Sequence, residues 1–374
     1  MLFLNSLVPS KLLHAAVRLA PILAALLLAA AACLGGAPSD KEVLIDLTDE
    51  VVAPAYRQLA GDSAELDSKA TALCSAPSEA ALEDTRQAWR SARASWLQTS
   101  AMSFGPVMDR RSESLLDWSP TDTAAIDESV ADTGFSTDAD QVRNSYSASR
   151  RGFGSIEHLL FRDDAVATVS GSLGYCQYLI ALTQLGREET EAIFADWTEG
   201  GELGTPYRDY FTDRASLSLV SGDAVEEVVR TQVFLIRDIV HMRMATALGL
   251  RGDGTDLTAI PGNAADNGLA DLRNELIGMQ RVYEGSGADS LGISDLVRPL
   301  SEETDQRLRE QLAAAIKAVD DVDGPLRVAI EERPEQVHAL YDRLADIQLT
   351  LATEVVSLLG VSVGFSDTDG DTLR

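Results

Sequence analysis

Residues 334–359 read PEQVHALYDRLADIQLTLATEVVSLL, and this stretch indicates the fold class most clearly. Its apolar residues recur at steps of three and four: Val337, Leu340, Tyr341, Leu344, Ile347, Leu351, Val355 and Leu358. Such spacing places them in one stripe, which predicts a long α-helix packed on one side against a core. Pro334 suits the first helical position and Gly360 suits the C-terminal cap.

The same periodicity extends through the rest of the chain. Residues 223–248 form a second clear segment, in which Asp223 and Glu226 resemble a capping pair and Gly249 follows the end. Further helices are predicted at 44–75, 80–103, 125–145, 148–162, 172–199, 268–284 and 302–320. Sustained alternation of β-branched residues, the signal for strands, is missing from the sequence. The chain is therefore predicted to be all-α.

Two breaks divide these helices. Residues 200–206 are rich in glycine, and residues 252–268 combine Gly, Asp, Asn and Pro, so both have loop composition. A chain of 374 residues is also too long for one small core. We therefore predict two antiparallel helical bundles packed side by side, one over residues 44–200 and the other over residues 207–365.

The N-terminus has the features of an export signal. Residues 1–32 place Lys11 and Arg18 ahead of an apolar stretch that is too short for a convincing membrane span. Cys33 follows three alanines, which resembles the lipobox of bacterial lipoproteins, although leucine is commoner where Ala30 stands. We predict a signal peptide over residues 1–32 and acylation of Cys33, the alternative being ordinary cleavage at the same place. The mature protein would then lie on the periplasmic side of a bacterial envelope, anchored by lipid in its outer membrane.

Lipidation of Cys33 would leave Cys74 and Cys176 as the other cysteines. Both lie near the ends of predicted helices, where a bridge does not strain a helix interior. Because an oxidising compartment favours pairing, we predict a disulfide between them. The alternative is two buried thiols that behave as small apolar groups. Residues 33–43 would form a tether between the lipid and the first helix.

The chain is strongly acidic, with a formal net charge of −28 that becomes −30 once residues 1–32 are removed. Such a surface repels the phosphates of nucleic acids and anionic lipid headgroups. We therefore predict no nucleic-acid partner, and contact with a membrane through the N-terminal lipid only. Residues 366–374 are predicted to be an acidic tail, because their calcium-loop-like opening ends before the glutamate that such a loop requires.

The segment RRGFGSIEH at 150–158 has the most unusual composition. Gly152 and Gly154 allow a neighbouring backbone or a ligand to approach closely. Glu157 and His158 follow Gly154 by three and four residues, so both can project over it from a helix. A carboxylate and an imidazole at an open space could hold a metal ion. The alternative is that the glycines only permit tight helix packing, while Glu157 pairs with a neighbouring arginine.

Other motifs that carry chemistry are few. The sequence has no P-loop, no Cys-x-x-Cys, no His-Glu-x-x-His and no Gly-x-Ser-x-Gly elbow. Glu335-x-x-His338 has the spacing of half a carboxylate-bridged di-metal site, but no matching second pair occurs. Asp238 and His241 fall outside the apolar stripe of their helix, so we expect both to be solvated.

Several segments, taken in order, resemble the imelysin family, the group once labelled insulin-cleaving membrane peptidases. They are VVAPAY at 51–56, AWRSARASW at 88–96, FGPV at 104–107, DWSPTD at 117–122, RVYEG at 281–285, GISDL at 292–296 and LGVSVGFSDTDGD at 359–371. Together they span nearly the whole mature chain. The family's hallmark is Gly-x-His-x-x-Glu, whereas this sequence has Gly152-x-Gly154-x-x-Glu157. Glycine therefore stands in place of the motif histidine.

The resemblance implies two helical bundles with a pocket between them, an envelope location and a part in iron-regulated uptake. Because the motif histidine is missing, we expect a noncatalytic protein that binds a metal ion or a metal chelate in the cleft. The metal would be iron or another divalent metal, and the protein would act with envelope uptake partners. The alternatives are a metallopeptidase of the imelysin type and an interaction scaffold without a small ligand.

The resemblance also assigns roles to the unusual segment and to the loop at 117–122. Glu157, the motif glutamate, would be a metal ligand or a hydrogen-bond acceptor. His158 is not a motif residue, but it shares the face of Gly154 and would be a second metal ligand in partial replacement of the missing imidazole. The other expected ligand-binding residues are Arg150 and Arg151 as a positive edge for an anionic chelate, Gly152 and Gly154 as space, and Asp117 and Trp118 as lining of the same cleft.

Overall fold

The computed structural model describes residues 37–131, 137–201, 204–213, 224–252 and 254–363. The predicted export signal, Cys33 and the acidic tail lie outside these residues. The described residues are helical and contain no strand, which confirms the predicted all-α class. The described residues from Ser39 onward belong to one compact unit.

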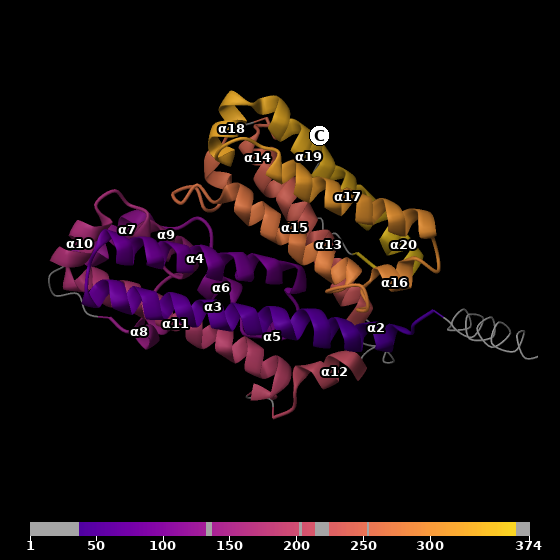
Figure 1. Cartoon of the computed structure of the whole chain (residues 1–374), viewed down its shortest axis with the longest axis horizontal. Helices are drawn as coiled ribbons and strands as arrows, with labels where there is room; N and C mark the ends of the chain where they lie inside the picture. The colour runs from indigo at the N-terminus through magenta and orange to yellow at the C-terminus, as the bar shows by residue number, and fades with distance from the viewer. Residues whose placement is uncertain (1–36, 132–136, 202–203, 214–223, 253, 364–374) are drawn as a thin grey trace, which may run out of the picture. The chain divides into compact units, whose positions relative to one another are not determined.

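Three long helical rods form the first group of helices, drawn in indigo and magenta in Figure 1. The N-terminal rod runs without interruption through three elements, a short turn then reverses the chain into α4, and α11 packs against α3. The bounds are α2 (Asp40–Asp46), the π-helical turn η1 (Leu47–Val52), α3 (Ala53–Ser75), α4 (Glu79–Thr99), the 3-10 turn η2 (Ser100–Met102) and α11 (Leu173–Thr198).

Short helices connect α4 to α11 and cover one end of the group. They are α5 (Pro106–Asp109), α6 (Glu113–Leu116), α7 (Thr123–Ala131), α8 (Ala139–Ser145), the 3-10 turn η3 (Ala148–Arg150), α9 (Gly152–Leu160) and α10 (Ala165–Gly171). Where the sequence predicts one helix over 125–145, the structure has α7 and α8. Helix α9, which carries the altered hallmark, packs against both α4 and α11.

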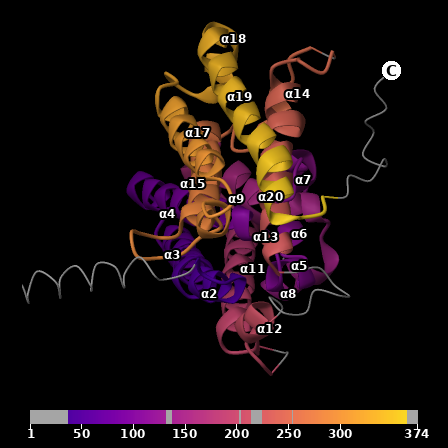
Figure 2. The same ribbon diagram turned by 90° about the vertical axis from the view of Figure 1, so that its right-hand side faces the viewer.

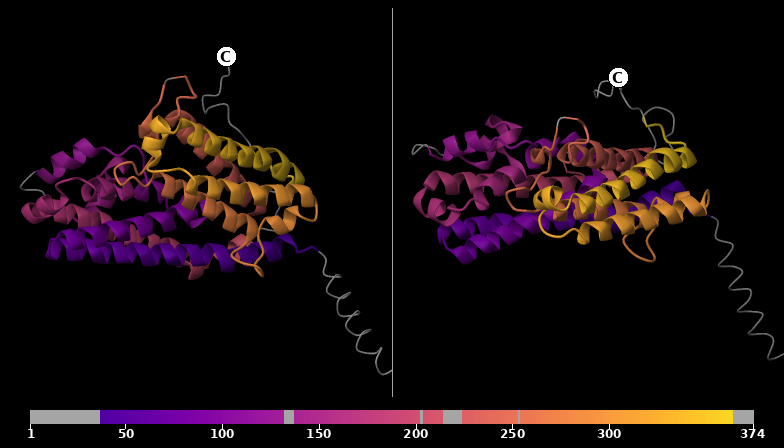
Figure 3. Two further views of the ribbon diagram at one scale, coloured as in Figure 1. Left: turned by 45° about the horizontal axis from the view of Figure 1, so that its top comes forward. Right: turned by 90° about the horizontal axis from the view of Figure 1, so that it is seen from above.

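The C-terminal half contributes a second group, in which α15 packs on α17, α17 on α19 and α13 on α19. Figures 2 and 3 show α17 and α19 side by side from different directions. The bounds are α13 (Ala224–Arg237), the π-helical turn η6 (Asp238–Met244), α14 (Ala245–Ala247), the 3-10 turn η7 (Leu257–Ala259), α15 (Gly268–Glu284), α16 (Ser294–Val297), α17 (Glu302–Asp320), α18 (Leu326–Glu332), α19 (Pro334–Leu349), the π-helical turn η8 (Thr350–Val355) and α20 (Val356–Leu359). Helix α12 (Tyr207–Asp213) instead packs against α2 and α11. The predicted division at 44–200 and 207–365 stays a prediction.

The first helix begins earlier than the apolar pattern indicates. The Ser39 hydroxyl accepts a hydrogen bond from the backbone N–H of Glu42 at 3.3 Å, and the Glu42 carboxylate accepts from the Ser39 N–H at 2.8 Å. This reciprocal capping box starts α2 at Asp40, four residues before the predicted position. Residues 40–43 of the predicted tether are therefore helical, and its other residues up to 36 lie outside the described part of the chain.

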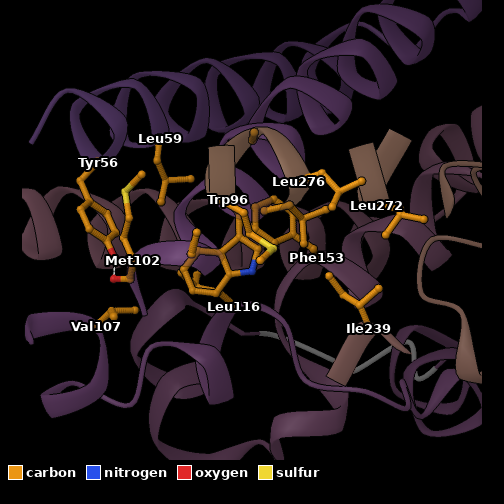
Figure 4. Packing of buried hydrophobic residues seen from close by; sticks show 14 of the residues in the cluster. Tyr56, Leu59, Trp96, Met102, Val107, Leu116, Phe153, Ile239, Leu272 and Leu276 are labelled. Carbon is orange, nitrogen blue, oxygen red and sulfur yellow. Dashed lines mark hydrogen bonds between the residues drawn. The ribbon is translucent and has the colours of Figure 1, made fainter. Parts of the chain in front are cut away.

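One apolar core joins the two groups of helices. Figure 4 shows Trp96 and Phe153 of the first group packed beside Leu276 and Leu272 of the second, all within a single cluster of buried residues. Helices α4 and α15 approach closely at Gly278, where an added Cβ would lie 2.2 Å from the Gln98 carbonyl oxygen. The site described below lies along this α4–α15 contact.

No single described helix is both long and apolar enough to cross a membrane. Helices α10 and α11 meet that criterion only as a pair, and they are bent by 107° at their junction. Much of α11 is buried in the core of the first group, which explains its apolar composition.

A disulfide ties the ends of two rods in the first group. Cys74 lies in the last turn of α3 and Cys176 in the first turn of α11, and the two are bonded with their Cα atoms 5.6 Å apart. The bond joins residues that are 102 positions apart in the sequence. It therefore links α3 to α11 at the end that the short helices cover.

Replacing both cysteines with serine should lower the free energy of unfolding by about 2–4 kcal/mol, because a long cross-linked loop restricts the unfolded chain. Chemical denaturation of the two proteins measures this difference. The wild-type protein in reductant should unfold at the same midpoint as the double variant. A midpoint that does not respond to reductant would show that the cysteines are not bonded.

Candidate functional site

A buried arginine lies at the contact between the two groups of helices. Arg93 of α4 is only 1% exposed, and it lies in the apolar stripe between Trp89 and Trp96. Its Nη1 donates to Asp117 Oδ1 at 2.9 Å, and its Nε donates to Asp271 Oδ2 at 2.7 Å. Burial alone would lower the pKa of this guanidinium, but the two carboxylates outweigh it and raise the pKa. Arg93 therefore remains charged and links three segments.

The two carboxylates come from different parts of the chain. Asp117 directly follows α6 and also accepts a hydrogen bond from the Trp96 indole N–H at 3.1 Å. Asp271 lies in the first turn of α15, where the Asn267 amide donates to it at 2.5 Å. Burial raises the pKa of Asp271, although Arg93 opposes the shift. The ion pairs thus join α4 to the loop after α6 and to α15.

A second arginine cluster lies one turn further along α15. Arg243, in the π-helical turn η6, donates from Nη2 to Glu275 Oε1 at 2.8 Å, and its Nε lies 2.9 Å from Asp238 Oδ2. Glu275 is 3% exposed, and its Oε2 has no hydrogen-bond partner in the described part of the chain. Burial raises the pKa of Glu275 to about 7, against the opposing effect of Arg243. This carboxyl group is therefore poised to titrate near neutral pH.

Both clusters line one cleft between the two groups of helices, with a volume of about 580 Å³. Its charged lining consists of Arg93, Arg243, Glu113, Asp117, Asp238 and Glu275. Four carboxylates thus face two arginines, so the cleft is acidic when all are ionised. Met108 and Phe234 add apolar surface and are 55% and 40% exposed. The lining of the cleft therefore combines charged and apolar side chains.

The structure separates the two expected cleft residues of the 117–122 loop. Asp117 lines the cleft and is fixed there by Arg93 and Trp96. Trp118 is 50% exposed and does not line it, although its neighbour Ser119 does. The physical reason is that the ion pair with Arg93 directs Asp117 inward, and Trp118 follows it on the exposed side.

The two glycines of the altered hallmark provide tight packing and no ligand space. An added Cβ at Gly152 would lie 2.2 Å from the Leu116 carbonyl oxygen, and Gly152 has φ +75°. An added Cβ at Gly154 would lie 2.1 Å from Thr121 Oγ1. Neither glycine lines the cleft. Thr121 therefore fills the place toward which a side chain at 154 would extend.

Glu157 and His158 have different partners. Glu157 is 7% exposed, and its Oε1 accepts the backbone N–H of Ala265 at 2.9 Å. Burial raises the pKa of Glu157, whereas the Ala265 N–H and Arg93 lower it less strongly. His158 Nε2 lies 2.9 Å from Asp127 Oδ1 instead. The structure therefore does not bring the two expected metal ligands together.

Arg150 and Arg151 are also held away from the cleft. Arg150 stacks on Tyr146, with its guanidinium carbon 4.4 Å from the ring centroid. Arg151 donates to the Arg143 carbonyl oxygen at 2.6 Å, and burial lowers its pKa. The expected positive edge is thus used in contacts among the short helices.

Direct metal coordination lacks a ready set of ligands. The described residues contain no group of three or more His, Cys, Asp or Glu side chains that could hold a metal ion. His338 Nδ1 lies 2.7 Å from the Pro334 carbonyl oxygen, and His241 Nε2 lies 2.9 Å from the Gln348 amide. Asp238 is half-exposed, as expected, but it lines the cleft beside Arg243.

A family model described as Imelysin matches residues 52–351. The chain belongs to the imelysin family. A relative named Iron-regulated protein A, from Synechococcus elongatus, is 26% identical over 321 residues that cover 83% of this chain and 84% of the relative.

Two solved structures share the imelysin fold. A protein assigned as an iron-regulated protein A precursor, from Parabacteroides distasonis, has a TM-score of 0.73 at 18% identity, with 87% of this chain and 97% of that chain covered. An imelysin-like protein from Psychrobacter arcticum has a TM-score of 0.70 at 20% identity, with 88% and 98% covered. At these identities the two structures support the fold.

In this imelysin, sequence reasoning missed the residues that build the cleft. Arg93 lies in the apolar stripe of its helix, three residues before Trp96 and four after Trp89. Asp271 and Glu275 lie in the stripe of α15, each directly before a buried leucine. Charged residues are almost never fully buried unless they are paired. Charged residues within apolar stripes therefore indicate buried ion pairs, and this signal could have identified the cleft residues from the sequence.

Thr121 should make alanine at position 154 unfavourable in this imelysin. Gly154→Ala should lower the free energy of unfolding by about 1 kcal/mol, because overpacking displaces the threonine side chain. In a Thr121→Ala background the same change should raise it by about 0.5 kcal/mol, as helix propensity predicts. Denaturant titration of the wild type, the two single variants and the double variant measures both changes in the free energy of unfolding. Gly186→Ala in α11, where an added Cβ meets nothing within 4 Å, should be favourable in both backgrounds.

Glu275 should make stability depend on pH. Its pKa is about 7 in the folded protein against an ordinary value of 4.5, so the folded state binds the extra proton between these values. Stability from this group is therefore lost as pH rises. Between pH 5.5 and 8, the wild-type protein should lose about 2 kcal/mol of unfolding free energy relative to Glu275→Gln. Urea unfolding at both pH values tests this, and an equal difference at the two pH values would contradict it.

Proposed function

We propose that this imelysin is a noncatalytic binding protein of the bacterial envelope that takes up a metal ion or metal chelate in its cleft. The observation that carries the proposal is the cleft of about 580 Å³, where four carboxylates and two arginines from both groups of helices meet. A cavity of this size can enclose a small molecule. Its carboxylate excess favours a cationic guest over an anionic one.

Iron is the favoured metal. The name Iron-regulated protein A belongs to a relative that shares 26% identity over most of both chains, and such a name is consistent with iron as cargo. Carboxylate oxygens are also suitable partners for hard cations. The metal would be cargo, carried into the cell with the help of envelope uptake proteins.

The expected location supports this role. The cysteine at position 33 follows an export-like segment, so acylation there would anchor the protein to the outer membrane on its periplasmic side. A disulfide between Cys74 and Cys176 is consistent with an oxidising compartment. An anchored binding protein at this location could receive cargo that has crossed the outer membrane.

Glu157 would act on the cleft indirectly. Its carboxylate holds the Ala265 N–H, and the loop before Ala265 supplies Ala259 and Pro261 to the cleft lining. Glu157 would therefore position the loop that forms part of the cleft wall. The carboxylates that meet the cargo would be those that line the cavity.

Equilibrium dialysis of the purified protein against ferrous iron, ferric citrate and zinc, followed by elemental analysis, tests the proposal. We expect near-stoichiometric, saturable uptake of at least one iron form and about tenfold weaker binding by Glu275→Gln. Glu310→Gln is the matched control, since it removes the same charge from an exposed position on α17. Weak, unselective binding that is equal in all three proteins would overturn the proposed function.

A further inference from the structure

Exposed apolar side chains gather around the cleft and along the helices beside it. Nine large apolar side chains are exposed in the described part of the chain. Single exposed apolar residues are normal on a protein surface, whereas a contiguous group of them marks an interaction site. Five of the nine form such a group, which we call the apolar face: Met108, Trp118, Phe234, Met242 and Leu349.

The cleft contributes the first part of the apolar face. Met108 of α5 and Phe234 of α13 both line the cleft, so each group of helices supplies one exposed apolar side chain to it. Trp118 stands between Asp117 and Ser119 in the chain, and both of these residues line the cleft. Its exposed indole therefore lies at the rim of the same cleft.

The continuous helical rod of α13 and η6 extends the apolar face away from the cleft. Phe234, Asp238 and Met242 follow one another at steps of four, so they lie along one side of this rod. All three side chains are exposed, which means that no described helix covers this side.

Helix α19 completes the apolar face. It packs against both α13 and η6, and the Gln348 amide lies 2.9 Å from Nε2 of His241, the residue before Met242. Leu349 follows Gln348 and is exposed. The apolar face thus continues from the cleft, along η6, to the end of α19.

The charged groups on this face present carboxylates to solvent and keep arginines beneath them. The side chains of Asp238 and Asp117 are 52% and 23% exposed. Those of Arg243 and Arg93, which pair with them, are 19% and 2% exposed. Glu113 also lines the cleft and is exposed. The surface between the apolar side chains is therefore acidic, and it attracts basic groups.

We propose that the apolar face docks a partner protein that presents an apolar segment flanked by arginine or lysine residues. The partner buries its apolar segment against Phe234 and Met242, since aromatic residues and methionine are enriched in protein interfaces. Its basic residues pair with Asp238 and Glu113. The inference goes beyond the proposed function, because docking on this face requires no metal in the cleft.

Charge decides between this partner and two other occupants of the apolar face. A second copy of the chain would bring the same carboxylates against each other, and like charges that face each other across an interface cost free energy. A lipid surface would have to remove water from Asp238, which stands between Phe234 and Met242, and burial of an unpaired carboxylate is expensive. A basic and apolar partner satisfies both kinds of side chain.

A short peptide of alternating arginine and leucine is the probe that tests this docking. Trp118 reports its binding, because the other three tryptophans are buried and acrylamide quenches an exposed indole most strongly. Addition of the peptide should protect Trp118 from acrylamide in a saturable manner. Phe234→Ser and Met242→Ser should each weaken binding about tenfold or more, as expected when a central apolar contact of an interface is lost.

Leu173→Ser is the matched control, because Leu173 is exposed at the start of α11 and does not line the cleft. This variant should bind the peptide as the wild type does. Replacing the leucines of the peptide with serine, or its arginines with glutamate, should weaken binding to the wild type about tenfold or more. Equal binding of the three peptides, or equal binding by the wild type, Phe234→Ser and Met242→Ser, would overturn the inference.

The other two occupants are tested with the same variants. Flotation with phosphatidylcholine vesicles measures membrane binding, and sedimentation equilibrium measures self-association. Membrane binding or dimerisation that Phe234→Ser abolishes would overturn the choice of partner. Failure of the peptide to bind a protein that still takes up iron would overturn this inference and leave the proposed function standing.

Discussion

The buried charge of Arg93 is the constraint on which the cleft depends. One guanidinium joins α4 to the loop after α6 through Asp117 and to α15 through Asp271. Burying a charge is expensive unless it is paired, and loss of one partner of a buried pair typically costs about 3–5 kcal/mol. The two groups of helices are therefore held in register where the cleft forms. Trp96 and Leu276 pack beside this network and bury apolar surface. The ion pairs, which are directional, fix how the helices are oriented to each other.

The altered imelysin hallmark fits this arrangement. Thr121, in the loop that supplies Asp117, fills the space beside Gly154 where a longer side chain would otherwise extend. Glu157 is buried, and its carboxylate accepts a hydrogen bond from the backbone N–H of Ala265, in the loop that follows the cleft residues Ala259 and Pro261. Glu275, Arg243 and Asp238 line the cleft, and none of them belongs to the hallmark. Gly154 and Thr121 thus form one packing contact, in which the threonine side chain requires a glycine as its neighbour.

Local patterns predicted the helices well and the site less well. The stripe over residues 334–359 is a helical rod in which most of the indicated residues are buried, whereas Tyr341 and Leu358 are only partly buried. Capping extended the first helix to Asp40, because Ser39 and Glu42 bond to each other's backbone. The structure places Arg150, Arg151 and His158 in contacts among the short helices, since Tyr146, Arg143 and Asp127 are their neighbours in space. Periodicity contains no information about those neighbours.

By itself, the sequence determined the all-α class, the imelysin resemblance and the acidic character of the chain, because helix spacing, capping and charge are local or additive properties. The tertiary structure alone decided which charged residues meet. Arg93 and Asp271 are 178 positions apart, and Arg243 and Glu275 are 32 positions apart. A buried ion pair depends on the mutual approach of two helices, and that approach is set by the whole core. The candidate cleft follows from this approach, which no short stretch of sequence encodes.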